Sequence, residues 1–234
     1  MKIRANFDNC SRNERGSTRL ELVAVLLALL LVALVAWPAL AGNRTRGDRI
    51  VCANNLRQVG AAFFIWANDR DDLMPFEVSI ANGGTRIHPL APNAWLHFSW
   101  ISNELRSPKI LFCPSDTGTP ARDFTGDPAR GYVHPNFANR ATSYFLTHQR
   151  TQGPTAVLAG DRNFYSVEQI GCSFFGTANR TTWPGFRWLP SLHEGEGNIL
   201  LADGQVLQTD TAALRVAIPR TGDDLGDIHF VMPR

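Results

Sequence analysis

The sequence has few cysteines and none of the paired spacings that bind metals or exchange disulfides. Its 234 residues include four cysteines, Cys10, Cys52, Cys113 and Cys172. No two of them form a C-x-x-C pair, so a zinc ribbon or a thioredoxin-like site is not expected. If the body of the protein faces outward, the last three cysteines allow one disulfide and one free thiol, and three unpaired buried cysteines are an equally good interpretation.

Recognisable catalytic motifs are also missing. The chain has no G-x-S-x-G nucleophile turn, no H-E-x-x-H zinc helix and no phosphate-binding loop. A triad of Ser115, Asp116 and His193 would need long-range contacts that nothing in the sequence indicates. Asp116 is better placed to cap the turn that follows Pro114. We therefore do not expect an enzyme.

No cofactor and no metal site are predicted. Calcium stays open as an alternative because Asp161, Glu194, Glu196 and Asp203 are acidic residues of expected loops or turns. Calcium takes six or more oxygen ligands, however, and the chain has no D-x-D-x-D-G loop, so solvated turns explain these acids better. His193 is expected to order its glycine-rich loop rather than to bind a metal.

A basic surface is lacking from most of the chain. The formal net charge is +2, and residues 1–16 alone hold four bases against two acids, so residues 17–234 are neutral overall. A neutral body gives no electrostatic reason to bind nucleic acid. The excess positive charge at the N-terminus would keep that end in the cytoplasm by the positive-inside rule.

What the chain does have is one long apolar run. Residues 20–41 form a stretch of 22 residues in which Glu21 is the only charged side chain. As a helix it would be roughly 33 Å long, about the thickness of a bilayer core. A stable anchor and a signal peptide cleaved after the A-x-A sequence at 39–41 are both open. A carboxylate in lipid costs about 2.5 kcal/mol or more, so Glu21 is expected to have a partner and a function.

The start of this run resembles the signature of type IV prepilins. Residues 15–22 read RGSTRLEL, and the family has a basic leader ending in glycine, with glutamate as the fifth residue after the cleavage point. The resemblance implies that a prepilin peptidase cuts between Gly16 and Ser17 and methylates the new amine. It also implies that Glu21 is an assembly carboxylate, which meets the terminal amine of a neighbouring subunit. The chain departs from the family pattern at Ser17, where phenylalanine is usual, and at Arg19.

Three further motifs extend the resemblance along the chain. Residues 52–60 read CANNLRQVG, residues 111–116 read LFCPSD, and residues 193–206 read HEGEGNILLADGQV. They are similar, in the same order, to motifs of pseudopilin-like proteins of planctomycete- and verrucomicrobium-like bacteria, a group associated with prepilin-type cleavage and methylation and with type II secretion. Because Cys52 and Cys113 lie in these motifs, they are the disulfide pair to test first.

The resemblance and the residue patterns together divide the chain. They predict a basic leader at 1–16, a transmembrane helix at 17–41, an amphipathic continuation of that helix at 42–72, and an extracytoplasmic head at 73–234. The continuation is expected because apolar residues between Val51 and Ala67 largely keep the three-and-four spacing of a helix face. Pro38 is expected to kink or loosen the helix.

The fold class predicted for the head is α+β, with the long N-terminal helix packed on a small antiparallel sheet and long loops. Short helices are expected at 95–105 and 212–218, the second capped by Asp210. Residues 114–141, rich in proline and glycine, are expected to form a long surface loop. The expected strands are 109–112, 143–146, 155–159, 171–175, 198–202, 205–208 and 228–232, with a hairpin turn at Asp203-Gly204.

The sequence thus predicts a pseudopilin-like structural subunit. It would pass once through a bacterial inner membrane, with its head in the periplasm, and its partners would be the membrane, the prepilin peptidase and other pilin-like subunits, with no nucleic acid. The alternative is a membrane-tethered module that binds a glycan or protein ligand and forms no filament. Its candidate ligand loop runs from Trp183 to Trp188, where aromatic side chains could stack on a sugar or a partner.

Overall fold

The structure is a computed structural model that describes residues 19–147, 153–165, 176–178, 185–218 and 228–233. Side chains are described at these positions except at 36–44, 176–178 and 228–229. The chain divides into two compact units, residues 1–43 and residues 44–234. The second unit contains the predicted head together with the C-terminal part of the long helix.

The first element is α1, Arg19–Asn68, a helix of 50 residues that continues through Pro38. Its end is set by a tight turn in which the carbonyl of Ala67 accepts hydrogen bonds from the N–H groups of Arg70 (2.8 Å) and Asp72 (3.1 Å). Asp71 and Asp72 both have positive φ angles, so the chain cannot continue as a right-handed helix. Within the described residues, no helix has a stretch that is both long and apolar enough to cross a membrane.

Short helices and turns follow α1 before the sheet begins. The expected helix at 95–105 is present as two pieces, α2 (Ala94–Trp100) and α3 (Ser102–Leu105). Three 3-10 turns accompany them: η1 (Ile80–Asn82), η2 (Pro108–Leu111) and η3 (Ala138–Ala141). The strand expected at 109–112 was wrong, because Pro108 at the first position of η2 favours a helical turn instead.

The described part of the head contains an antiparallel sheet of six strands in the order β4-β8-β1-β2-β6-β7 and a separate ribbon of β3 with β5. The α+β class predicted for the head is therefore correct. The expected strand at 171–175 lies outside the described residues. The strands are β1 (Tyr144–Thr147), β2 (Val157–Asp161), β3 (Phe164–Tyr165), β4 (Gly176–Ala178), β5 (Arg187–Trp188), β6 (Gly197–Leu201), β7 (Val206–Thr209) and β8 (Ile228–Val231).

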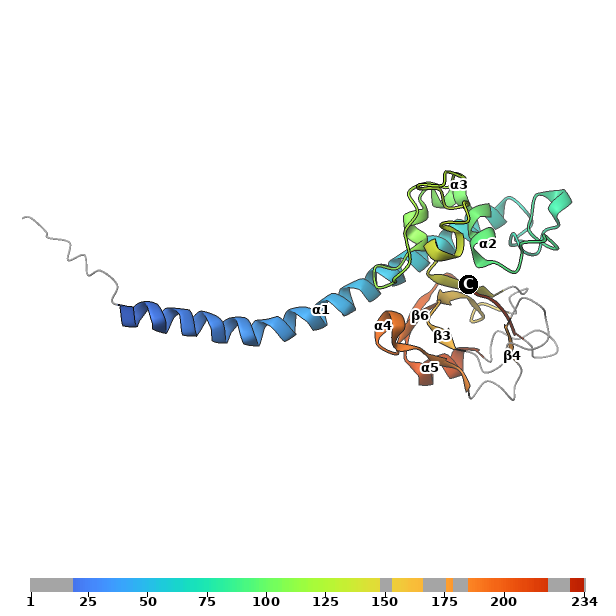
Figure 1. Cartoon of the computed structure of the whole chain (residues 1–234). Coiled ribbons are helices and arrows are strands. Elements are labelled where there is room, and N and C mark those ends of the chain that lie inside the picture. The colour runs from blue at the N-terminus through green and yellow to red at the C-terminus, as the bar shows by residue number, and fades with distance from the viewer. Residues whose placement is uncertain (1–18, 148–152, 166–175, 179–184, 219–227, 234) are drawn as a thin grey trace, which may run out of the picture. The chain divides into compact units, whose positions relative to one another are not determined.

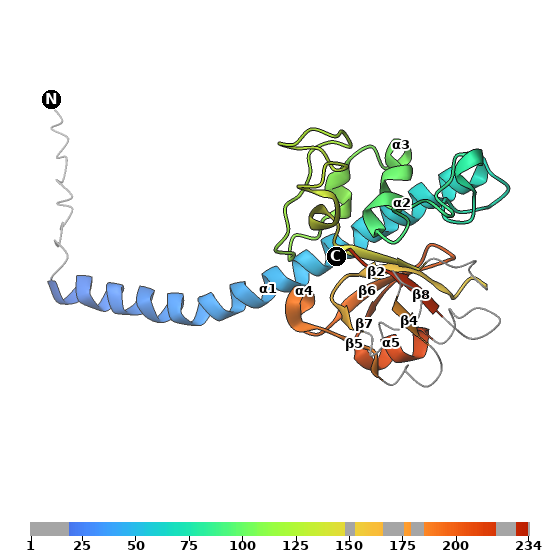
Figure 2. The same cartoon turned by 45° about the vertical axis from the view of Figure 1, so that its right-hand side comes forward.

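Two core clusters pack on opposite faces of the large sheet, because successive side chains of a strand point to opposite faces. In β1, Tyr144 and Leu146 belong to the core cluster that contains Phe63 of α1, whereas Phe145 belongs to a second, aromatic cluster. In Figures 1 and 2, α2 and α3 lie on one side of the C-terminal part of α1, and the sheet lies on the other. The second cluster includes Phe164, Phe186, Trp188, Leu214 and Phe230.

The C-terminal elements follow the expected local signals. β6 and β7 form a hairpin, and Gly204 in its turn has a φ of 86°, which favours glycine. The Asp203 carboxylate accepts a hydrogen bond of 2.9 Å from the N–H of Gln205 and so stabilises the same turn. Asp210 caps α5 (Thr211–Ala217) by accepting 2.7 Å from the N–H of Ala213. A second short helix, α4 (Pro190–His193), precedes β6.

Candidate functional site

A buried disulfide connects α1 to the chain that follows η2. Cys52 and Cys113 are bonded through their sulfur atoms, with a Cα–Cα distance of 5.2 Å, and both residues are fully buried. This is the pair that the motif resemblance put forward for testing. A cross-link between residues 61 positions apart restricts the unfolded chain and is worth about 4 kcal/mol in the chain-entropy model.

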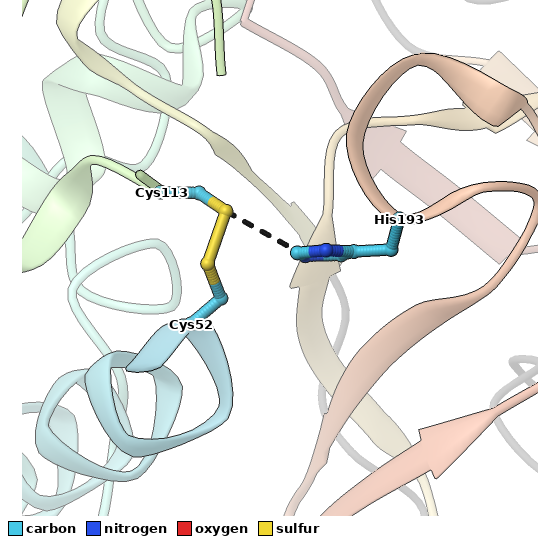
Figure 3. Close-up of side chains that lie close together, drawn as sticks. All are labelled: Cys52, Cys113 and His193. Atoms are coloured by element: carbon cyan, nitrogen blue, oxygen red, sulfur yellow. Dashed lines mark hydrogen bonds between the residues drawn. A yellow bond between two sulfur atoms is a disulfide. The ribbon is translucent and has the colours of Figure 1, made fainter. Parts of the chain in front are cut away.

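His193 brings a third segment to the disulfide. It is the last residue of α4, a single turn that starts at Pro190 and ends where Glu194 and Gly195 take positive φ angles of 55° and 88°. Its imidazole Nε2 lies 3.5 Å from the sulfur of Cys113. Figure 3 shows the imidazole ring pointing from its loop toward this sulfur, with Cys52 on α1 at the other end of the disulfide.

Asp161, at the end of β2, completes the group that we call the disulfide–histidine cluster: Cys52, Cys113, Asp161 and His193. The Oδ2 atom of Asp161 lies 3.3 Å from His193 Nε2, and both side chains are fully buried. The same oxygen accepts hydrogen bonds from the backbone N–H (2.7 Å) and the side-chain amide (2.8 Å) of Asn198. A buried carboxylate needs such donors to offset the loss of hydration.

Arg49 links α1 to the same part of the sheet. Its guanidinium donates to the carbonyls of Gly197 and Thr209, each at 3.2 Å, and forms an ion pair with Glu196. Burial lowers the pKa of Arg49, and Asp161 and Asp210 partly oppose this shift by favouring the charged form. The backbone carbonyl of Arg49 also accepts a hydrogen bond of 3.5 Å from the side-chain amide of Asn198. The first turns of α1 within the head are thus held by polar contacts to β6 and β7.

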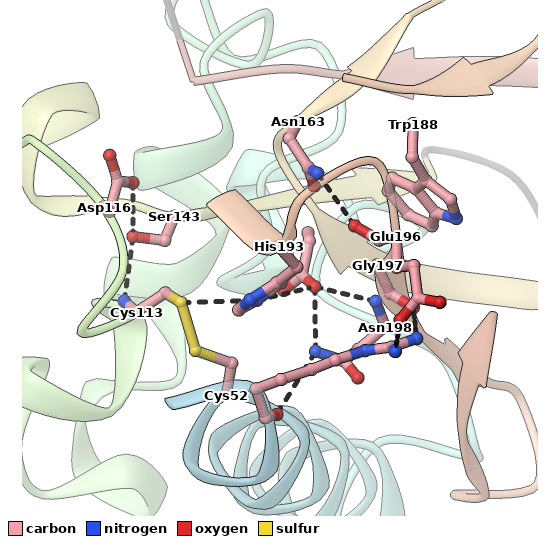
Figure 4. A network of polar contacts seen from close by, with 12 residues as sticks. Cys52, Cys113, Asp116, Ser143, Asn163, Trp188, His193, Glu196, Gly197 and Asn198 are labelled. Carbon is pink, nitrogen blue, oxygen red and sulfur yellow. Dashed lines mark hydrogen bonds and ion pairs between the residues drawn. A yellow bond between two sulfur atoms is a disulfide. The ribbon is translucent and has the colours of Figure 1, made fainter. Parts of the chain in front are cut away.

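A second set of contacts fixes the Cys113 side of the cluster. The backbone N–H of Cys113 donates a hydrogen bond of 2.9 Å to Ser143 Oγ. The Ser143 hydroxyl in turn donates a hydrogen bond of 2.6 Å to Asp116 Oδ2. Asp116 also forms an ion pair with Arg162 and accepts from the N–H of Gly118. The predicted turn-capping role of Asp116 is therefore only part of its contacts. Figure 4 shows this branch on one side of the disulfide and His193 on the other.

Asn163 and Trp188 hold the loop that carries His193. The amide of Asn163 donates to the carbonyls of Leu189 (2.8 Å) and Glu196 (2.9 Å), which flank the loop. The Trp188 ring lies so close to Gly197 that a Cβ there would come within 2.6 Å of it. This explains why position 197 of β6 carries no side chain. Figure 4 shows both residues beside the Asn198 part of the network.

The cluster has the members of a Cys–His–Asp catalytic triad but not its geometry. In a triad, one imidazole nitrogen faces the nucleophile and the other faces the carboxylate. Here His193 Nε2 faces both Cys113 (3.5 Å) and Asp161 (3.3 Å), and Nδ1 has no hydrogen-bond partner among the described residues. The sulfur is bonded to Cys52 and fully buried. The arrangement suits a structural or ligating role better than nucleophilic catalysis.

The Trp183–Trp188 ligand loop predicted for the alternative function needs correction at its described end. Trp188 is 3% exposed and belongs to the aromatic cluster, and its indole N–H donates 3.1 Å to the hydroxyl of Thr209. Its ring therefore cannot stack on a ligand at the surface. Trp183 lies outside the described residues. Of the two tryptophans proposed to bind a ligand in the tethered module, Trp188 is therefore not available at the surface.

The other predicted site residues are spread along the chain. Gly16 and Ser17, the predicted cleavage site, lie outside the described residues, and Glu21 is an exposed acid in the first turn of α1. Within the part of the chain that the structure describes, the four acids considered for calcium form no group that could hold a metal ion. Their partners differ: Asp161 accepts from Asn198, Glu194 from Thr45 and Asp203 from its own turn, and Glu196 pairs with Arg49. Among the described residues, the one group placed to hold a metal ion is Cys52, Cys113 and His193.

Sequence reasoning missed that Asp161 joins His193 and the disulfide, and that Asn198 and Arg49 lie beside this group. A signal was nevertheless present, because three of the motifs that carried the family resemblance meet at this cluster. Residues 52–60 supply Cys52, residues 111–116 supply Cys113 and Asp116, and residues 193–206 supply His193 and Asn198. Comparisons with known proteins find no matching family model, no similar curated protein and no similar solved structure.

Proposed function

We propose that the protein is a pseudopilin-like structural subunit. Residues 20–41 tether its head to a bacterial inner membrane, a prepilin peptidase cleaves between Gly16 and Ser17, and Glu21 takes part in assembly with other pilin-like subunits. The head then lies in the periplasm, where a disulfide is stable. The protein acts by packing and recognition within a secretion-type or pilus-like assembly, without catalysis.

The observation that carries this proposal is the exposure of the N-terminal part of α1. Every large apolar side chain from Leu20 to Val35 is more than half exposed, with values from 54% to 82%. Such a surface is unstable in water and requires lipid or other apolar helices around it. An acid in the first turn, Glu21, suits a partner with positive charge, such as the terminal amine of a neighbouring subunit.

The head supports the proposal through its attachment to α1. Arg49, Cys52 and the apolar face that includes Phe63 hold the C-terminal part of α1 by an ion pair, a disulfide and core packing. A subunit that assembles through its N-terminal helix needs such a connection, because forces on the helix must reach the head without local unfolding.

The first experiment is the N-terminal sequence and intact mass of the full chain extracted from membranes. A chain that begins at a methylated Ser17 is the expected result. A chain that begins at Gly42 would indicate a signal peptide, and an intact Met1 start would indicate an uncleaved anchor. Either result would contradict the processing step.

The second experiment tests assembly with Glu21→Ala and a matched control, Asp69→Ala, which removes an exposed acid just beyond α1. We expect Glu21→Ala to abolish cross-linking to other pilin-like subunits in membranes while Asp69→Ala retains it. Equal cross-linking by the two variants would contradict the role of Glu21. The head disulfide, measured by thiol labelling, serves as the control for folding in both.

A further inference from the structure

We propose that the dithiol form of this protein binds one zinc ion at the disulfide–histidine cluster, with Cys52, Cys113, His193 and Asp161 as ligands. The disulfide and the zinc site are then two alternative ways of holding the same junction between α1, η2, β2 and α4. The inference rests on the head alone and is independent of the proposed assembly function.

Three ligand atoms already converge. The two sulfur atoms and a ring nitrogen of His193 all lie within 4.8 Å of one another, and all three residues are buried. They come from distant parts of the chain, so their convergence is a property of the fold. Two thiolates and one imidazole form a donor set that prefers zinc among the common divalent ions.

Two distances to His193 Nε2 match those of a tetrahedral site. With zinc bonds to sulfur, nitrogen and oxygen of the usual lengths, tetrahedral geometry places sulfur and nitrogen about 3.6 Å apart, and nitrogen and oxygen about 3.3 Å apart. The structure has 3.5 Å between Cys113 Sγ and Nε2, and 3.3 Å between Nε2 and Asp161 Oδ2. In a catalytic triad, the carboxylate and the nucleophile face different nitrogens of the imidazole. Here one nitrogen faces both a sulfur and a carboxylate, as expected for ligands around a shared ion.

A second observation points to a ligand at this place. Asp161 Oδ1 is buried and has no hydrogen-bond partner among the described residues, although Oδ2 accepts two hydrogen bonds from Asn198. An unsatisfied oxygen of a buried carboxylate is costly. A cation beside this carboxylate would satisfy Oδ1, and Asn198 would support the carboxylate from outside through Oδ2.

Charge explains why the dithiol form favours an ion. Once the disulfide is open, two sulfur atoms lie buried beside the Asp161 carboxylate, and two thiolates would add to its negative charge. A divalent cation offsets this charge. The two sulfur atoms must separate to about 3.8 Å, the tetrahedral spacing of two zinc-bound thiolates. With four protein ligands the site is closed, which is typical of structural rather than catalytic zinc.

Conversion between the two forms balances as follows. Two zinc-bound thiolates give two electrons to a disulfide oxidant and the Cys52–Cys113 bond forms. The disulfide of the oxidant breaks, and its two sulfur atoms take up two protons from solvent and leave as two thiols. The zinc ion departs, since neither sulfur of the new disulfide is a thiolate. The chain is synthesised with free thiols, so the zinc form comes first and the disulfide form follows on oxidation.

The test uses the full chain in detergent, with Cys10→Ser and Cys172→Ser so that only the two cluster thiols remain. The protein is reduced with a phosphine and titrated with Co²⁺, and Zn²⁺ is then added to displace it. We expect one Co²⁺ per chain, with thiolate-to-cobalt charge-transfer bands and the absorption of a tetrahedral ion. The same protein oxidised to the disulfide is expected to show neither.

Two variants show whether the histidine is a ligand. His193→Gln is expected to weaken zinc binding by at least about 100-fold, because even the loss of a hydrogen bond to a ligand costs about 10–100-fold. Glu194→Gln, at the adjacent exposed acid, is expected to leave the affinity unchanged. A readout that needs no variant is the thermal midpoint, which Zn²⁺ should raise in the reduced protein only.

Three results would overturn the proposal. The first is a reduced protein that shows only the spectrum of Co²⁺ in buffer. The second is equal metal binding by the reduced and oxidised forms. The third is a His193→Gln protein that is folded by circular dichroism and binds zinc as tightly as Glu194→Gln.

Discussion

Two parts of α1 are both rich in apolar residues and differ in what surrounds them. At residues 20–35 the large apolar side chains are 54% to 82% exposed, whereas Cys52, Leu56, Val59 and Phe63 are fully buried. The first part is apolar on all sides. In the second part, exposed polar residues such as Arg57 and Gln58 lie on the side opposite the apolar face. The same residue types therefore indicate a core only where their spacing confines them to one side of the helix.

The comparison teaches that periodicity, and not apolar content, separates the head from the segment before it. Residues at three-and-four spacing meet the sheet and α2, and they are fixed further by the disulfide and by Arg49. The uniform stretch has no polar face to point at water. Substitutions in the two parts should therefore differ in their effect on stability.

The largest effect is expected from truncation in the buried part. Phe63→Ala removes a fully buried ring that lies 5.9 Å from the ring of Phe98, and it should lower the free energy of unfolding by about 4 kcal/mol. Leu27→Ala, at a side chain that is 55% exposed, should change it by less than about 0.5 kcal/mol. Urea denaturation of the full chain in detergent, followed by tryptophan fluorescence, measures both. Similar values for the two variants would break the comparison.

A smaller effect is expected from the polar contacts that hold the buried part. Asn198→Ala removes the side-chain amide that donates to Asp161 (2.8 Å) and to the carbonyl of Arg49 (3.5 Å). We expect a loss of about 2 kcal/mol, because a buried carboxylate is left with one donor fewer. The control is Asn54→Ala at an exposed position of α1, which should cost less than about 0.5 kcal/mol. If Asn198→Ala costs no more than Asn54→Ala, the amide contacts of Asn198 do not stabilise this junction.

Alkaline pH should weaken the same junction. Burial raises the pKa of the Tyr144 hydroxyl, which lies 3.5 Å from the carbonyl of Cys52, and the charge of Asp161 raises it further. Because the pKa is raised in the folded state, the neutral Tyr144 hydroxyl contributes its full stability below about pH 10, the pKa of tyrosine in the unfolded chain. This contribution is lost as the pH rises above that value. By pH 11 this effect of Tyr144 lowers the free energy of unfolding by about 1.4 kcal/mol.

The measurement is urea unfolding between pH 9 and pH 11. Tyr144→Phe should reduce the fall in stability over this range. Tyr165→Phe, at an exposed tyrosine, should leave the fall unchanged and is the matched control. Burial also raises the pKa of Tyr132. Some fall in stability at high pH is therefore expected to remain in Tyr144→Phe. A profile that is identical in Tyr144→Phe and in the unmodified protein would contradict the prediction.

The smallest effect is expected at Gly47, on the part of α1 just before the packed face. A Cβ at this position would have no heavy atom within 4 Å, so Gly47→Ala should raise the free energy of unfolding by up to about 1 kcal/mol through helix propensity. Ala61→Gly, at an exposed position inside the packed part, should lower it by a similar amount. Thermal unfolding followed by circular dichroism measures the pair. A decrease in Gly47→Ala would show that the helix is not continuous there.

Much of the fold could be predicted because its signals are local. The hairpin at Asp203-Gly204 and the cap at Asp210 formed as expected, since each depends on residues within a few positions. The strand expected at 109–112 was wrong, although its residues favour a strand. There the chain forms the helical turn η2, which Pro108 favours, and Cys113 two residues later is bonded to the distant Cys52.

The site was predictable only in part. The motifs drew attention to Cys52 and Cys113, yet nothing near either cysteine indicated Asp161, which comes from β2, or Arg49, whose partners are carbonyls of β6 and β7. Only the alternative function placed Trp188 in a ligand loop, and the residue is buried because Gly197 leaves room for its ring.

The sequence by itself determined where α1 is uniformly apolar and where it is amphipathic, because these properties depend only on the order of residues along one helix. Tertiary structure alone decided which polar groups are buried together. The disulfide–histidine cluster exists because β2, α4, η2 and α1 bring four side chains to one place. Each of those contacts joins residues more than thirty positions apart, and no local preference encodes such a distance.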